Sequence, residues 1–114
     1  SRARDPLNPS TTQGDLTVAV STGGASPALA KKIRQDLQQH FGPEYALALV
    51  LLARVRELVM KKELSLEERQ RLFTALVESP LLHYLHKKDT DRVNMLLQQI
   101  VGVHCTCEAL GVTL

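Results

Sequence analysis

Only one segment of this chain has the alternating, β-branched pattern of a strand, and this limits the fold more than any other feature. The segment is DLTVAVS, residues 15–21. A single strand is not stable alone, because its backbone groups need a partner. The rest of the sequence offers no obvious second strand, so we expect a neighbouring chain or another domain to supply the pairing.

Downstream of this strand the sequence has the periodicity of helices. Ser26 and Pro27 are typical of a helix start, and apolar residues then recur every four positions at Leu29, Ile33, Leu37 and Phe41. A second helix is predicted over about residues 43–62, with buried candidates at Leu47, Val50, Leu51, Val55, Leu58 and Val59. Its first half is apolar on nearly every side, which a small chain struggles to cover. The simplest cover is a second subunit, so we expect a homodimer.

Shorter helical segments complete the chain. A Ser-Glu capping box opens a helix over about residues 65–77, and a Ser-Pro pair opens a short one over about residues 81–87. Asp89 or Thr90 caps a last helix that ends at Gly102, with an apolar face made of Val93, Leu96, Leu97 and Ile100. The tail after it is compatible with a frayed turn and with a short strand.

These elements predict a mainly α fold with a small β element, in which one swapped or intersubunit strand is followed by four to five helices. We divide the chain into a flexible lead-in (residues 1–14), a dimerisation segment (15–62) and a C-terminal helical subdomain (63–114). The lead-in has two prolines and almost no apolar side chains, so it cannot bury enough surface to offset its entropy.

Composition excludes several classes of function. The net charge of +2 is too weak to suggest binding to duplex phosphates, and two Phe, two Tyr and no Trp offer no stacking platform for single strands. The longest apolar run, residues 45–53, is half of a membrane span. We see no charged leader before an apolar stretch, and two cysteines are too few for a disulfide framework. We therefore expect a cytoplasmic protein without nucleic-acid or membrane partners.

The junction between strand and first helix, TGGASP at residues 22–27, is the strongest candidate for a binding site. Gly23 and Gly24 let a ligand approach the backbone, and the N–H groups of a helix N-terminus favour an anion. Hydroxyl and cationic groups surround the glycine pair, at Ser21, Thr22, Ser26, Lys31, Lys32 and Arg34. The glycine spacing is neither that of a dinucleotide motif nor that of a P-loop. The local chemistry leaves two interpretations open, a tight turn and an anion site.

Two other clusters fall short of a metal site. His83 and His86 are three residues apart, and two ligands are fewer than a usual site needs. His104, Cys105 and Cys107 form a denser group, but no second ligand pair completes it. We interpret these thiols as inert and predict no metal. The mixed charges of residues 54–71 have the spacing of a solvated helix face, and no catalytic arrangement stands out.

The run GDLTVAVSTGGASPALAKKIR, residues 14–34, resembles siroheme synthase, and more closely the bifunctional precorrin-2 dehydrogenase/sirohydrochlorin ferrochelatase family. A run of this length is far more specific than a glycine pair. A looser similarity continues at residues 53–56. The last 25 or so residues carry no matching motif.

The resemblance implies a fold and a reaction. Members of the family have a Rossmann domain, then a dimerisation segment with a swapped strand and helix, then a helical C-terminal region. They oxidise precorrin-2 to sirohydrochlorin with NAD⁺, and many then insert Fe²⁺. This chain resembles the later parts and has no dinucleotide glycine motif, so the resemblance implies that NAD⁺ binds to residues outside it.

The resemblance also assigns candidate residues. The positions that match one by one include Pro27 and the expected substrate-binding residues Ser21, Thr22, Gly23, Gly24 and Ser26, whose loop borders the tetrapyrrole cleft in the family. Lys31 adds charge for a substrate rimmed with carboxylates. The acid–base aspartate of the family falls at Arg4, one position from Asp5, so we transfer no catalytic role to Asp5.

The expected function is therefore that of the dimerisation and tetrapyrrole-cleft part of a siroheme biosynthesis enzyme. We expect this part alone to lack dehydrogenase activity. The alternative is a non-enzymatic helical protein-interaction module whose exposed apolar helix binds a partner.

Overall fold

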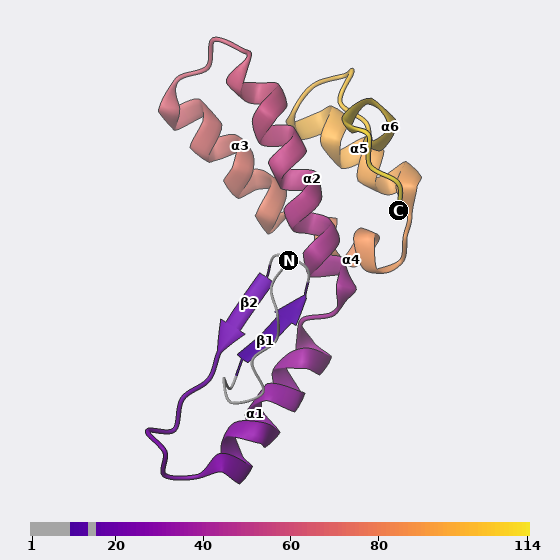
Figure 1. Ribbon diagram of the computed structural model, residues 1–114. Coiled ribbons are helices and arrows are strands. Elements are labelled where there is room, and N and C mark those ends of the chain that lie inside the picture. The colour runs from indigo at the N-terminus through magenta and orange to yellow at the C-terminus, as the bar shows by residue number, and fades with distance from the viewer. Residues whose placement is uncertain (1–9, 14–15) are drawn as a thin grey trace. The chain divides into compact units, whose positions relative to one another are not determined.

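The structure, a computed structural model, describes residues 10–13 and 16–114. The described residues form two strands and six helices, which confirms the mainly α class with a small β element (Figure 1). The chain divides into two compact units, Ser1–Ala46 and Leu47–Leu114. The boundary that we predicted after residue 62, between the dimerisation segment and the C-terminal helical subdomain, stays a prediction. In the described part of the chain, no helix has the length and apolarity to cross a membrane.

The first unit contains a β-hairpin. Strand β1 (Ser10–Gln13) pairs antiparallel with β2 (Leu16–Ala19), and the register joins Gln13 to Leu16. The prediction that another chain supplies the partner strand is therefore wrong, because the partner lies inside the segment that we expected to be a flexible lead-in. Two threonines suit a strand, and the Gly-Asp pair between the two strands is a dipeptide typical of a two-residue hairpin. The low apolar content of the lead-in hid this local signal.

Helix α1 (Pro27–His40) contacts β1 and completes the first unit (Figure 1). Ser26 is its N-cap, as predicted, and the side chain of Ser26 accepts a hydrogen bond from the N–H of Leu29 at 3.2 Å. The predicted apolar row is only partly covered, since Leu29 is 49% exposed and the buried side chain is Ala30.

Helix α2 (Pro43–Met60) begins in the first unit and continues into the second. Its buried residues, spaced three or four apart on one face, are Ala48, Leu51, Val55 and Val59. Val50 was predicted to be buried but is 46% exposed, and Leu49 beside it is 38% exposed. The helix ends two residues earlier than predicted.

The second unit packs α2 with four further helices around one apolar core. These are α3 (Leu66–Glu78), α4 (Leu81–His86), α5 (Thr90–Ile100) and α6 (Cys107–Leu110), and α5 contacts the other three. The capping box before α3 is present, and Asp89 rather than Thr90 caps α5. Lys88, between α4 and α5, has a left-handed backbone with φ of 53°.

The tail forms a helix where we expected a frayed turn or a short strand. Thr106 caps α6, and Gly111 ends it with φ of 73°. The side-chain oxygen Oδ1 of Asn94 on α5 accepts a hydrogen bond from the N–H of Cys107 at 2.8 Å. This bond fixes the start of α6 to α5, and it places Leu110 and Val112 in the core.

Candidate functional site

The junction between β2 and α1 is a tight turn built on its two glycines. The carbonyl of Thr22 accepts a hydrogen bond from the N–H of Ala25 at 3.2 Å. Gly23 and Gly24 have φ of 65° and 78°, so both central positions are left-handed, as in a type I′ turn. A Cβ atom built on either glycine would meet nothing within 4 Å. The turn therefore needs glycine for backbone conformation, and the space outside it is open.

The hydroxyl groups that we expected to face a ligand hold the loop together. Ser21 Oγ accepts a hydrogen bond from the N–H of Gly23 at 3.3 Å. Thr22 Oγ1 accepts from the N–H of Ser26 and donates to the carbonyl of Ser26, both at 3.3 Å. Ser26 Oγ caps α1, so the hydroxyl groups of all three residues form hydrogen bonds within the loop.

The turn still presents backbone donors at its outer side. Within residues 16–114, the N–H groups of Gly24 and Ala28 make no hydrogen bond, and both residues are exposed. They lie at the turn and in the first turn of α1, where the helix dipole favours negative charge. Lys31 follows on the same helix, is exposed and forms no ion pair with the described residues. Lys32 is bound to Asp36 at 3.1 Å in an exposed pair that contributes little to stability.

The structure does not bring the other candidate ligands together. His83, His86 and His104 are exposed, whereas Cys105 and Cys107 are each only 2% exposed. Burial raises the pKa of both thiols above the ordinary 9.0, so both stay protonated near neutral pH. In the part of the chain that the structure describes, no group of three or more His, Cys, Asp or Glu side chains is placed to hold a metal.

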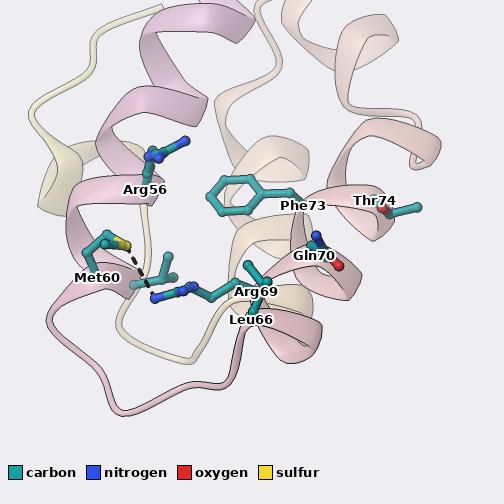
Figure 2. Close-up of a pocket in the computed structure, with 8 residues that line it drawn as sticks. Arg56, Met60, Leu66, Arg69, Gln70, Phe73 and Thr74 are labelled. Atoms are coloured by element: carbon teal, nitrogen blue, oxygen red, sulfur yellow. Dashed lines mark hydrogen bonds between the residues drawn. The ribbon is translucent and has the colours of Figure 1, made fainter.

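Sequence reasoning missed a pocket in the second unit. It lies between α2 and α3, has a volume of about 650 Å³, and is lined by two arginines, Arg56 and Arg69, over apolar side chains (Figure 2). We had interpreted the charges of this region as a solvated face. Alternating signs at helical spacing carry no information on where two helices leave space between them, so only the structure shows this pocket.

The sequence that forms this turn is similar to that of known proteins. Residues 13–40 match the family described as "Sirohaem biosynthesis protein central". The chain is 26% identical over 102 residues to "Siroheme synthase" of Xylella fastidiosa (strain M12), which covers 90% of this chain and 21% of that protein. It is 32% identical over 66 residues to "Precorrin-2 dehydrogenase" of Priestia megaterium, which covers 58% of this chain and 33% of that protein. The chain is therefore similar to parts of a siroheme synthase and of a precorrin-2 dehydrogenase.

A solved structure agrees with this relationship. The structure of "SirC, precorrin-2 dehydrogenase" matches with a TM-score of 0.65 and 28% identity, over 88% of this chain and 48% of that one. The expected family resemblance is confirmed, and the match with the family covers the whole glycine turn. The chain spans between about a fifth and about half of the length of these relatives.

Proposed function

We propose that this chain is the dimerisation and tetrapyrrole-cleft part of a siroheme biosynthesis enzyme. That enzyme oxidises precorrin-2 to sirohydrochlorin with NAD⁺, and in its bifunctional form it inserts Fe²⁺ as a second substrate. The observation that carries the proposal is that the exposed glycine turn and the start of α1 lie within the residues that match the family. A cytoplasmic location belongs to the same proposal.

The chemistry of the turn suits a substrate with many carboxylates. The N–H groups of Gly24 and Ala28 can donate to one carboxylate, and Lys31 supplies positive charge next to them. Ser21, Thr22, Gly23 and Ser26 then act indirectly, because they hold the backbone that presents these donors. These hydrogen bonds support an indirect role, and direct contact of the hydroxyl groups with the substrate stays a prediction.

The described residues do not fit NAD⁺. The only sheet they form is an antiparallel hairpin, whereas the pyrophosphate of a dinucleotide binds where a parallel strand meets a helix. We therefore propose that NAD⁺ binds outside this chain, and that the glycine turn and the start of α1 supply a wall of the substrate cleft. None of these residues is assigned an acid–base role.

Titration with sirohydrochlorin tests the proposed substrate site. Lys31→Gln should weaken binding by at most about fivefold, the range of exposed charge pairs. Gly24→Asn should weaken it by about tenfold, because asparagine tolerates the left-handed turn but its side chain occupies the open space through which the ligand approaches the backbone donor. Lys87→Gln, which removes the same charge from an exposed position at the end of α4, is the matched control and should bind as the unaltered chain does.

Two outcomes would overturn this assignment. One is that neither turn variant changes the affinity, and the other is that Lys87→Gln weakens binding as much as Lys31→Gln does. If the unaltered chain binds no sirohydrochlorin at all but still associates with protein, the result would favour the alternative of a helical protein-interaction module.

The proposed homodimer rests on the uncovered face of α2. The paired hairpin removes strand exchange as a reason for dimerisation, but Leu49 and Val50 remain exposed side by side. We expect light scattering to find a dimer at micromolar concentration, and we expect Val50→Asp to shift the chain to monomer. Val77→Asp on α3 is the matched control, since Val77 is 59% exposed and should not affect the dimer. A monomeric unaltered chain would refute the dimer.

A further inference from the structure

The pocket between α2 and α3 has the size and composition of a small-molecule site. Its volume of about 650 Å³ lies within the range of about 300–1,000 Å³ that is typical of such sites. Val59, Met60, Leu66 and Phe73 make it largely apolar, and in Figure 2 the ring of Phe73 projects from α3 toward α2. All of these residues belong to the second unit.

The charge of the pocket is positive and is not neutralised. None of its lining residues is acidic, and it contains two guanidinium groups. In Figure 2, Arg69 extends from α3 to α2, where its Nη1 donates to the thioether sulfur of Met60 at 3.5 Å. A thioether is a weak acceptor and a poor partner for a guanidinium ion. Arg56 has no hydrogen bond or ion pair to any residue that the structure describes.

Two carboxylates at the start of α3 form no ion pair with these arginines among the described residues. Glu68 is bound into the capping box, where its Oε1 accepts a hydrogen bond from the N–H of Ser65 at 3.4 Å. Glu67 does not line this pocket, and with Arg71 it lines a neighbouring hollow that shares Gln70 and Thr74 with it. The two pocket arginines are therefore not the positive halves of a helix-surface ion-pair network.

Large apolar side chains at the rim remain in solvent. Met60 is 55% exposed and Leu66 is 61% exposed, although both line the pocket. A ligand that covered them would gain free energy from burial of apolar surface, and its acidic group would pair with a guanidinium fork. A simple inorganic anion would gain only the second of these contributions.

We propose that the α2–α3 pocket, defined by Arg56, Met60, Leu66, Arg69 and Phe73, binds a small organic carboxylate with an apolar body. This site is separate from the glycine turn and from the proposed substrate wall, and it does not depend on the proposed function. Arg69 binds the carboxylate after it leaves the sulfur of Met60, while Phe73 and Leu66 contact the apolar part of the ligand.

A nuclear magnetic resonance titration of the ¹⁵N-labelled chain tests the proposal with defined probes. The probes are 3-phenylpropionate, its uncharged amide 3-phenylpropanamide, and inorganic phosphate. We expect saturable shifts of the backbone amides of the pocket residues with 3-phenylpropionate, and binding about tenfold weaker with each of the other two probes, because each lacks one of the two contributions.

Substitutions identify the residues responsible. Arg69→Gln and Arg56→Gln should each weaken 3-phenylpropionate binding by about tenfold, and neither should change binding of the uncharged amide. Arg71→Gln is the matched control, because Arg71 is exposed on the same helix but does not line this pocket. Unchanged amide spectra elsewhere in the second unit verify that each variant is folded.

Several results would overturn the proposal. If 3-phenylpropionate and 3-phenylpropanamide bind equally well, the pocket recognises only apolar groups. If phosphate binds as well as 3-phenylpropionate, the pocket is a nonspecific anion site. Absence of saturable shifts at the pocket, or an equal loss in Arg71→Gln, would reject the site. None of these results bears on sirohydrochlorin binding at the glycine turn, so the two proposals fail separately.

Discussion

Replacement of the turn glycines by alanine should destabilise the first unit through the backbone alone. Gly23 and Gly24 have positive φ, and a Cβ on either one meets no atom within 4 Å, so no clash contributes. A left-handed conformation costs an L-residue about 1–2 kcal/mol, and the lower entropy of unfolded alanine returns about 0.4–1 kcal/mol. The net loss should be about 1 kcal/mol for each substitution and about 2 kcal/mol for both. Asparagine, which tolerates this conformation, should lose less than alanine at each position.

The two tyrosines allow each unit to be followed separately. Tyr45 lies in the first unit, where its ring meets that of Phe41 edge-on at 4.9 Å, and Tyr84 lies in the second. Urea unfolding followed by tyrosine fluorescence in a Tyr84→Phe background therefore reports on the hairpin and α1. Gly111→Ala is the control, because Gly111 is also left-handed but belongs to the second unit, and its effect should appear only with Tyr84 as the probe.

The reasoning is refuted if alanine at both glycines lowers the free energy of unfolding of the first unit by less than about 0.5 kcal/mol. It is also refuted if asparagine costs as much as alanine, since the loss would then not come from the left-handed backbone.

Three further predictions concern the second unit. Asn94→Ala should cost about 1–3 kcal/mol of unfolding free energy in urea, because it leaves the Cys107 N–H without its acceptor, whereas Asn94→Asp keeps an acceptor and should cost less. Lys88→Gly should raise the free energy of unfolding by about 0.5–1 kcal/mol, because glycine removes the strain of the left-handed φ of 53°. A lower free energy of unfolding in thermal denaturation would contradict this. Cys105 and Cys107 should react slowly with a thiol reagent at pH 8, and the stability of the chain should fall as the pH rises above about 9. The sign follows because the raised pKa keeps both protons on the folded state while the unfolded state releases them, and thiols that react as fast as free cysteine would refute it.

The sequence predicted the starts of α1, α3 and α5 because each of them depends on bonds over a few residues. The Ser26 cap, the Ser65–Glu68 box and the Asp89 cap all join groups three residues apart, so the local pattern contained the whole interaction. The pairing of Gln13 with Leu16 was equally local, but the composition of the lead-in outweighed it.

What the sequence could not predict depends on contacts between distant residues. The bond from Asn94 to Cys107 spans 13 residues, and nothing in the tail alone indicates it. Whether Val50 is buried depends on where the other helices lie, since its own helix is apolar on both sides. At the candidate site the glycine pair was found from its chemistry, but the use of the hydroxyl groups inside the loop required coordinates.

The apolar core of the second unit is fully buried only when the C-terminal residues are present. Leu110 and Val112 fill one side of the cluster that also contains Leu51, Val93 and Leu97. During synthesis, a ribosome that stops within α5 would therefore leave this cluster open to water, with its leucines available to chaperones. Completion of this unit has to wait until residue 112 has emerged from the ribosome.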